Sequence, residues 1–174
     1  MISVRSPITY QKPAPSDGRR LWQLARDTEC LDLNSAYFYN QFSTHFSDTS
    51  IVAIQDDRIV GFVIAYWNPQ QQDSLFIWQI GVCPSAQRQG IGLALLQSLI
   101  ASQANQPLTT IQATITPSNN ASIRLFHSLA TTRHTSLTRT PHFSRDDFPD
   151  CHEPEDLITI TINPSQGVPY DTNY

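Results

Sequence analysis

Between positions 87 and 92 the sequence reads Gln-Arg-Gln-Gly-Ile-Gly, after an apolar stretch and before a leucine-rich one. Gly90 and Gly92 allow the backbone to turn sharply and to approach a ligand without a Cβ atom in the way. Free amides at the start of the following helix converge on an anion, and the helix dipole adds about half a positive charge there. Arg88 could add a charge-assisted hydrogen bond to a phosphate. The segment therefore predicts a site for a phosphate-bearing ligand.

Two other phosphate-binding loops can be excluded. A P-loop requires the string Gly-x-x-x-x-Gly-Lys-Ser/Thr, which does not occur in the sequence. The dinucleotide-binding fingerprint requires a third glycine, but position 95 is Leu95. An ordinary helix start with a glycine cap remains an alternative for the loop taken alone.

The hydrophobic periodicity predicts the elements that hold this loop. Helical spacing occurs in four segments: Ser16 to about Thr28, Ala36 to Phe46, Ile91 to about Ala104, and Ala121 to Ala130. Strand patterns occur in five segments: Ser50–Gln55, Arg58–Trp67, Ser74–Val82, Thr109–Thr116 and Leu157–Ile162. Residues 131–156 are polar and contain three prolines, so we expect them to be irregular. This order predicts a mixed sheet with helices on its faces, an α/β or α+β fold.

Length and charge restrict the function further. The 174 residues fit one domain, which we expect over residues 1–164, with residues 165–174 as a flexible C-terminal tail. The net charge is −4 and the 11 Lys and Arg residues are dispersed, so no nucleic-acid partner is expected. A small cationic substrate suits this charge better. No apolar run approaches the roughly 20 residues that span a bilayer, and the N-terminus lacks a secretory pattern, so we expect no membrane partner and a cytoplasmic location.

The cysteines and histidines do not indicate a metal site. Cys30, Cys83 and Cys151 are far apart and form no Cys-x-x-Cys pair, as expected for reduced thiols in the cytoplasm. The five histidines show no His-x-x-x-His pair and no cluster with cysteine. We therefore predict that the protein holds no metal.

Two motifs together resemble a known family. Gln87-x-x-Gly90-x-Gly92 after an apolar strand is similar to the coenzyme A loop of the GNAT N-acetyltransferases. Downstream, Asn119-Asn-Ala-Ser-Ile-Arg-Leu-Phe126 is similar to the Asn-x-x-Ala-x-x-Leu-Tyr helix of the same family. Because chance seldom produces both motifs in this order, the resemblance outweighs the reading of the loop as a plain helix cap.

The resemblance implies acetyl-CoA as the co-substrate and a mostly antiparallel central sheet that is splayed at the cofactor-binding strand. That strand would pair with the pantetheine arm, and the loop amides would hold the pyrophosphate. The cofactor-binding residues implied are Ile80, Gly81, Val82, Gln87, Arg88, Gln89, Gly90, Ile91, Gly92, Asn119 and Phe126.

Four further strings resemble the branch of this family that acetylates the 4-amino group of L-2,4-diaminobutyrate in ectoine biosynthesis, a response to osmotic stress. The strings are Leu31–Tyr39, Phe76–Ile80, Thr114–Asn119 and Phe148–Glu155. The likeness extends from roughly Ile8 to Pro164, and it also implies a homodimer. The aromatic segment 36–46 would then lie either in the dimer interface or in the substrate pocket.

The chemistry of such an acceptor agrees with the residues in these strings. Diaminobutyrate carries two ammonium groups and one carboxylate, so its pocket needs carboxylates and hydrogen-bond donors. Aromatic side chains could pack on the short aliphatic chain or face a cation. The candidate substrate-binding residues are Asp32, Asn34, Ser35, Tyr37, Trp78, Thr116, His152, Glu153 and Glu155.

Six of these candidates also have a structural alternative. Asp32 could cap a turn, Tyr37 could belong to the core, and Trp78 could pack within the sheet. Glu153, Glu155 and His152 could belong to a solvated loop.

Acetyl transfer requires that the ammonium group of the acceptor lose a proton before it attacks the thioester. Many family members place a carboxylate on the central strand as the base, but Trp78-Gln79-Ile80-Gly81 contains none. Many place a tyrosine as general acid where this chain has Phe126. We therefore predict that Asp32, Glu155 or His152 accepts the proton, with Tyr37 or Tyr39 as the candidate acid.

Two rival functions remain at this point. One is the same reaction on another small amine or amino acid. The other is a non-catalytic module that binds acyl-CoA and regulates a partner, which the absent carboxylate and tyrosine would allow.

Overall fold

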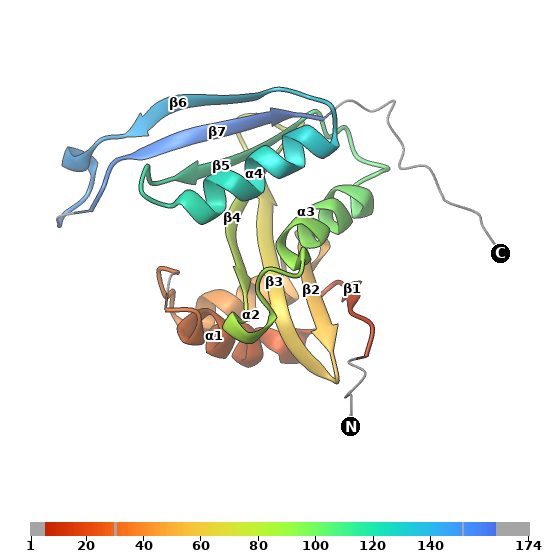
Figure 1. Cartoon of the computed structure of the whole chain (residues 1–174). Helices are drawn as coiled ribbons and strands as arrows, with labels where there is room; N and C mark the ends of the chain where they lie inside the picture. Colours follow the sequence, from red (N-terminus) through yellow and green to blue (C-terminus); the bar gives the residue numbers. More distant parts are fainter. Residues whose placement is uncertain (1–5, 30, 151, 163–174) are drawn as a thin grey trace.

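The central sheet organises the molecule (Figure 1). In the computed structural model, which describes residues 6–29, 31–150 and 152–162, seven strands form one sheet in the order β1-β2-β3-β4-β5-β7-β6. Every neighbouring pair is antiparallel except β4 and β5, which are parallel. The strands are β1 Thr9–Gln11, β2 Ser50–Gln55, β3 Arg58–Trp67, β4 Ser74–Val82, β5 Thr110–Ile115, β6 Leu137–Phe143 and β7 Glu155–Thr161. The expected tail, 165–174, and two of the cysteines, Cys30 and Cys151, lie outside the described residues.

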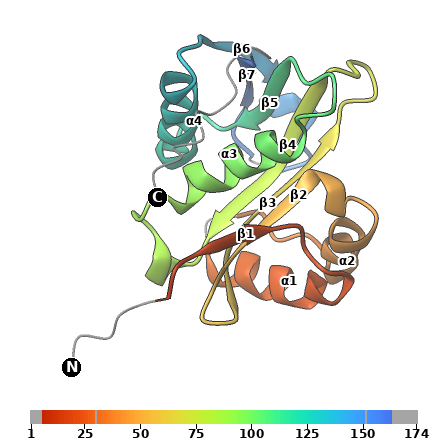
Figure 2. The ribbon, with the colours of Figure 1, turned by 90° about the vertical axis from the view of Figure 1, so that its right-hand side faces the viewer.

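Helices cover both faces of the sheet. Helices α1 (Gly18–Asp27) and α2 (Ala36–Thr44) lie on one face, and α3 (Ile91–Ser102) and α4 (Asn120–Thr132) on the other (Figures 1 and 2). The mixed, mostly antiparallel fold with helices on both faces, predicted from the sequence, is confirmed. No helix among the described residues is long and apolar enough to cross a membrane.

Strand alternation on β3 separates the two halves of the core. Phe62 and Ile64 point toward α1 and α2, whereas Val63 and Ala65 point toward α3. All four side chains are fully buried, so β3 is covered on both faces. That burial explains why its sequence is a continuous apolar run instead of an alternating one.

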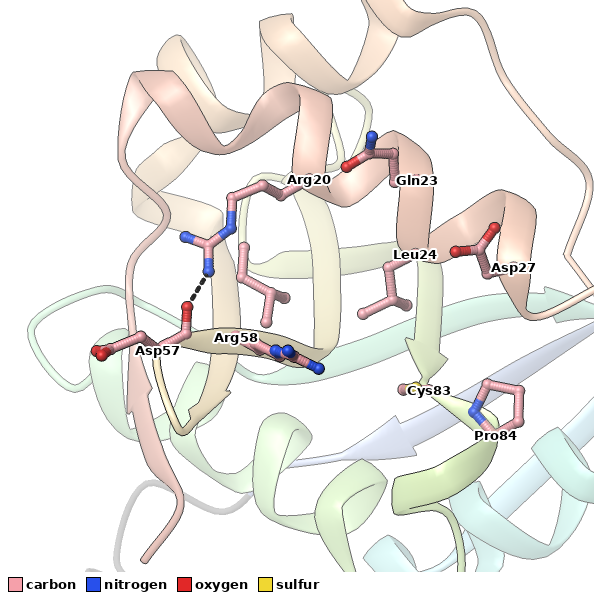
Figure 3. Close-up of a pocket in the computed structure, with 9 residues that line it drawn as sticks. Arg20, Gln23, Leu24, Asp27, Asp57, Arg58, Cys83 and Pro84 are labelled. Carbon is pink, nitrogen blue, oxygen red and sulfur yellow. Dashed lines mark hydrogen bonds between the residues drawn. The ribbon is translucent and has the colours of Figure 1, made fainter. Parts of the chain in front are cut away.

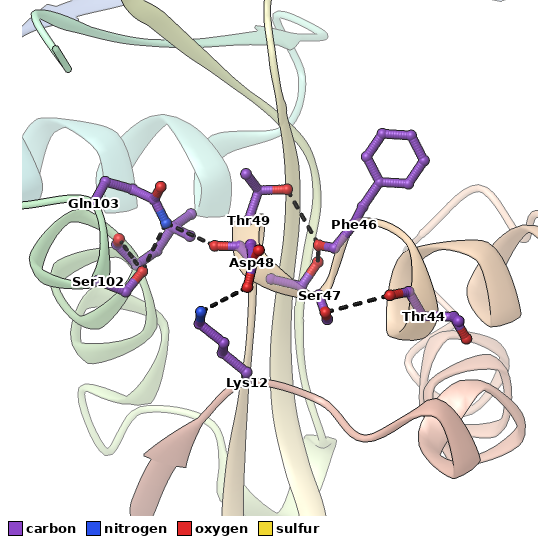
Figure 4. Close-up of polar contacts among 10 residues, drawn as sticks. Lys12, Thr44, Phe46, Ser47, Asp48, Thr49, Ser102 and Gln103 are labelled. Atoms are coloured by element: carbon purple, nitrogen blue, oxygen red, sulfur yellow. Dashed lines mark hydrogen bonds and ion pairs between the residues drawn. The ribbon is translucent and has the colours of Figure 1, made fainter. Parts of the chain in front are cut away.

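A hydrogen bond joins the turn after α2 to the end of α3 (Figure 4). The side-chain amide of Gln103, just after α3, donates to the carbonyl oxygen of Asp48 at 2.7 Å. The carboxylate of Asp48 accepts from the ammonium group of Lys12 at 2.6 Å. Because Gln103 is buried, its bond is protected from water and connects the two helical layers around the edge of the sheet.

Two strands, β1 and β6, were not predicted from the sequence. The prediction that residues 131–156 are irregular was wrong, because β6 occupies Leu137–Phe143. This strand is exposed along nearly its whole length at the edge of the sheet and contains Pro141, so it shows neither an apolar alternation nor a strand-like composition. β1 is only three residues long. Strand β7 starts at Glu155, two residues earlier than predicted, which brings that carboxylate into the sheet.

Close contact between α1 and α2 gives the first prediction. A Cβ atom on Gly18 would lie 2.0 Å from Oδ1 and 2.8 Å from Cα of Asn40. Because the second contact is with backbone, Gly18→Ala should force the helices apart and destabilise the fold by about 1–3 kcal/mol. Thermal unfolding should show a lower Tm. For the control Gly92→Ala, whose nearest contact would be an ordinary 3.4 Å to Leu125, we expect little change in Tm; equal losses in both variants would contradict the explanation.

Candidate active site

The parallel strands β4 and β5 stay together over only three residue pairs. Ser74, Leu75 and Phe76 pair with Thr110, Ile111 and Gln112, and beyond them β5 diverges from β4. Figure 1 shows β5, β7 and β6 turning away from the sheet half that contains β2, β3 and β4. Within the part of the chain that the structure describes, the edge of β4 from Ile77 to Val82 therefore faces no strand, and its backbone groups can pair with an extended ligand. The splay predicted at this strand is confirmed.

A β-bulge lies at the point of divergence. Gln79 is opposite Ile64 and Ile77 is opposite Ala65, so Trp78 is an extra residue with no partner on β3. The bulge turns two consecutive side chains toward α2. The Trp78 ring lies 5.6 Å from that of Phe38, and Gln79 is hydrogen-bonded to Tyr39.

The loop between β4 and α3 has the geometry that the sequence predicted for anion binding. Arg88 has φ +59° and Gly90 has φ +78°, both in the left-handed region. Gly90 is the N-cap of α3 and has no side chain to occupy the free amides of the first turn. The loop is exposed from Gln87 to Gly90. These features fit a pyrophosphate, and the nearby open edge of β4 fits the pantetheine arm that would follow it.

Several predicted cofactor residues also serve the fold. The Asn119 side chain caps α4 by accepting from the amide of Ser122 at 3.0 Å. Phe126 is 1% exposed within the main core, which favours a role in packing α4 against the sheet. The Gln87 side chain donates to the carbonyl oxygen of Val82 at 3.2 Å, so it lies at the end of the open edge of β4.

Two loops that are far apart in sequence bring three predicted catalytic residues together. Nε2 of His152 lies 4.0 Å from Oδ2 of Asp32 and 3.9 Å from Oε1 of Glu155. Nδ1 of His152 lies 2.6 Å from the carbonyl oxygen of Glu153, which can only accept, so Nδ1 carries a proton. The ring also stacks on Phe148 at 4.1 Å. Asp32, His152 and Glu155, called the acidic cluster below, thus form a negatively charged site with a titratable centre.

The electrostatics of the acidic cluster stabilise the charged imidazole. The hydrogen bond to the Glu153 carbonyl raises the pKa of His152, and partial burial opposes this effect. The negative charges of Glu155, Asp32 and Asp150 raise the pKa further. A protonated His152 would partly neutralise the two carboxylates that face it.

The remaining predicted substrate residues differ in their local surroundings. Asn34 and Ser35 contribute to the local structure, since Asn34 donates to the Asp32 carbonyl and Ser35 caps α2. Glu153 accepts from the hydroxyl of Ser118 at 2.8 Å, which ties the loop before β7 to the start of α4. Thr116 is half-buried at the end of β5, whereas Tyr37 and Trp78 are exposed by 71% and 49%. Neither aromatic residue therefore has the buried core position considered as an alternative.

Tyr39 does not suit the role of general acid. It is 0% exposed, and its hydroxyl donates to Oε1 of Gln79 at 2.9 Å. Burial raises the pKa of Tyr39, although hydrogen bonding to Asn34 acts in the opposite direction. Gln79 was not among the site residues predicted from the sequence, although it interrupts an otherwise apolar strand; a polar residue at such a position signals a buried hydrogen bond.

Two cavities open beside the site. An aromatic groove of about 610 Å³ runs along α2 and reaches Trp78, with Phe38, Phe46 and Tyr66 in its wall. A smaller cavity of about 320 Å³ lies between α1 and the β2–β3 turn (Figure 3). Its wall carries charges of both signs, and Arg20 donates to the carbonyl oxygen of Asp57 at 2.6 Å. None of the predicted site residues lines it.

The sequence matches the Acetyltransferase (GNAT) family over residues 17–130, which include the open strand edge and the phosphate-binding loop. The chain therefore belongs to the GNAT acetyltransferase family, whose members use acetyl-CoA. The enzyme class and the co-substrate predicted from the sequence are confirmed. Within the described residues, no group of three His, Cys, Asp or Glu side chains is arranged to hold a metal ion.

Closer relatives carry a more specific name. The chain is 44% identical to the L-2,4-diaminobutyric acid acetyltransferase of Shouchella clausii, covering 91% of this chain and 90% of that protein. It is 41% identical to the enzyme of the same name from Nocardia farcinica, covering 85% and 77%. The fold is similar, with a TM-score of 0.85, to that of the diaminobutyrate acetyltransferase EctA from Paenibacillus lautus in complex with L-2,4-diaminobutyric acid and coenzyme A. That structure is 39% identical to this chain, and the match covers 90% of this chain and 95% of the other.

The left-handed glycine of the loop yields a prediction on cofactor binding. In Gly90→Ala, a Cβ atom would meet nothing within 4 Å, but φ +78° is unfavourable for alanine by about 1–2 kcal/mol. The loop should therefore leave its binding geometry, and the Kd for coenzyme A, measured by calorimetry, should rise about tenfold. Gly90→Asn is the matched comparison, because asparagine tolerates the left-handed region but adds a capping side chain, so any loss of affinity there would come from occupied helix amides and not from backbone strain. Equal affinity of the alanine variant and the parent protein would contradict the assigned role of Gly90.

Proposed function

We propose that this protein transfers the acetyl group of acetyl-CoA to the 4-amino group of L-2,4-diaminobutyrate and thereby serves ectoine biosynthesis and osmoadaptation. The observation that carries the proposal is the acidic cluster, in which Asp32, from the loop before α2, and Glu155, at the start of β7, both lie about 4 Å from His152 (4.0 and 3.9 Å). It offers negative charge to a small cation, and the sequence relationships named above support the choice of acceptor.

The chemistry of the acceptor explains the arrangement. The 2-amino group and the carboxylate share one carbon, so a site that recognises this zwitterionic end leaves the 4-amino group free to react. Trp78 offers an exposed ring to the short aliphatic chain, and Tyr37 offers a second ring and a hydroxyl. Donors from Asn34, Ser35 and Thr116 would read the amino-acid end, and Glu153 would hold the loop in place.

The reaction proceeds in this proposal by direct transfer. A carboxylate of the acidic cluster, or His152 in its neutral form, accepts a proton from the 4-ammonium group. The amine nitrogen then bonds to the thioester carbonyl carbon, and amides on the open edge of β4 stabilise the oxyanion. The carbon–sulfur bond breaks as the carbonyl re-forms, and the nitrogen releases its second proton to water. The thiolate takes a proton from water or from Tyr37, which then regains one from solvent. No acyl-enzyme is needed, and Cys83 takes no part.

An assay with purified protein tests the function. Acetyl-CoA and diaminobutyrate should release one free thiol for each N4-acetyl product, measured with a thiol reagent and by mass spectrometry. A matched panel of ornithine, lysine and a polyamine examines other acceptors. Thiol release with one of these amines but not with diaminobutyrate would refute the acceptor, and coenzyme A binding without turnover on any amine would point to a regulatory module.

Neutral replacements test the acidic cluster. Asp32→Asn and Glu155→Gln keep the side-chain shape and remove the charge, so binding of the cationic acceptor should weaken. We expect kcat/KM for the acceptor to fall by about one hundredfold, the scale of 2–3 kcal/mol for a lost charged hydrogen bond. The KM for acetyl-CoA should stay within about twofold, since the loop that holds it is separate. Unchanged acceptor kinetics in both variants would remove these residues from the site.

The raised pKa of His152 predicts a pH dependence. Because the folded-state pKa lies above the ordinary value, the protonated form contributes stability below the ordinary histidine pKa, and this contribution is lost as the pH rises through the raised pKa. Over the same range the acidic cluster becomes more negative, so the acceptor KM should fall severalfold. A plot of the acceptor KM against pH should therefore show an inflection from His152. The His152→Asn variant should lose this inflection but keep the one that comes from titration of the acceptor's own amino groups. An identical profile in the variant would show that another group titrates.

The proposal includes a homodimer in the cytoplasm. The aromatic groove along α2, with Phe46 exposed by 42%, is an apolar surface of the kind that subunits bury against each other. Cys83, the free thiol among the described residues, is compatible with a reducing compartment. Light scattering should give about twice the 19.6 kDa chain mass, and a mass of one chain would refute the dimer.

A further inference from the structure

Gln79 connects the bulged strand to the loop that carries Asp32. Its side chain is 8% exposed, between β4 and α2, although it sits next to the exposed Trp78. Oε1 accepts from the Tyr39 hydroxyl at 2.9 Å, and Nε2 donates to the carbonyl oxygen of Asp32 at 2.8 Å. The three residues come from β4, α2 and the loop between α1 and α2, and the two bonds connect them.

An amide is well suited to this position. It presents an acceptor and a donor at the same time, and here each faces a group of the complementary kind. A carboxylate could still accept from Tyr39 but would direct its second oxygen at the Asp32 carbonyl. Two acceptors would then face each other in a buried place, with no proton between them.

The loop has few other attachments near Asp32. The Asp32 side chain is 97% exposed, and its only contact among the described polar groups is His152 at 4.0 Å. Its carbonyl also receives the Asn34 side chain, but that bond is local and long, at 3.4 Å. Leu31 packs beside Gly81 of β4, and Asn34 is hydrogen-bonded to Tyr39, but the Gln79 bond is the one that holds the Asp32 backbone itself to the sheet among the described residues. Tyr39 supports Gln79 from the other side, because its 0% exposure allows the hydroxyl no competing water.

We propose that Gln79, held by Tyr39, is a positioning residue that fixes the Asp32 loop against β4 and so determines how well the acidic cluster binds the acceptor. The expected effect on the acceptor KM rests on the proposed function, whereas the expected effect on the loop's hydrogen exchange does not. Gln79 occupies the strand segment where many family members have the catalytic base. In this chain the same place holds the acceptor site together without itself exchanging a proton.

The decisive variant is Gln79→Glu, assayed at alkaline pH so that the buried carboxyl is ionised, which preserves shape and removes the donor. The acceptor KM should rise about tenfold, the factor for one lost buried hydrogen bond, with a smaller change in kcat. The KM for acetyl-CoA should stay within about twofold. Tyr39→Phe should shift the acceptor KM in the same direction but less, because Gln79 keeps its bond to Asp32. Hydrogen exchange of the backbone amides in residues 31–38 should accelerate in Gln79→Glu.

Gln112→Glu is the matched control. Gln112 is also a buried amide that both donates and accepts, on β5, with Gln71 and Asn68 as its partners. The Gln112→Glu variant should have a lower Tm, with an unchanged acceptor KM and unchanged hydrogen exchange of the backbone amides in residues 31–38.

Three outcomes would overturn the inference. The first is an unchanged acceptor KM and unchanged loop exchange in Gln79→Glu. The second is an equal KM effect in the control, which would reduce the role of Gln79 to general stability. The third is a higher kcat with a new acidic limb in the pH profile of Gln79→Glu, which would make position 79 a base site. If the parent protein does not acetylate diaminobutyrate, the proposed function fails, whereas the exchange measurement still decides the role of Gln79.

Discussion

The divergence of β4 from β5 is the constraint on which the site depends. Parallel strands normally satisfy each other's backbone groups along their length, but here the pairing ends at Phe76. From Ile77 to Val82 the strand keeps its pairing with β3 on one side, while its other side pairs with no strand among the described residues and only the Val82 carbonyl accepts from a side chain, that of Gln87. An extended amide-containing ligand such as a pantetheine arm supplies the missing partner. The same opening separates the sheet into two halves whose loops can approach an acceptor from both directions.

The phosphate end and the amine end of the site are built by different means. At the phosphate end, positive φ at Arg88 and Gly90 and an uncapped helix start turn backbone amides outward, so side chains matter little there. At the amine end, the bulge at Trp78 turns side chains toward α2, and the loops contribute charges. Backbone recognition suits an invariant cofactor, whereas side-chain recognition allows the acceptor to differ between related enzymes.

Neutral Gln79 is consistent with this division of roles. A carboxylate in the middle of β4 would be buried beside α2 and would require a partner of its own. With an amide there, the negative charge of the site lies on Asp32 and Glu155, which face His152 and the incoming ammonium group. The arrangement separates the residue that holds the loop from the residues that bind the cation.

Particular residues show what the sequence by itself determined. The glycines of the loop, the leucines of α3 and the apolar run of β3 predicted the phosphate-binding turn and the elements around it, because such patterns reflect local conformation and burial. Asp32, His152 and Glu155 were predicted as site residues from the motifs around them. Only the tertiary structure decided that Asp32 and Glu155 face His152, that Trp78 is a bulge, that Tyr39 is too buried to donate a proton to substrate, and that Gln79 bonds to the Asp32 loop. Those facts depend on strand register and on contacts between segments tens of residues apart, which the order of residues along the chain does not encode locally.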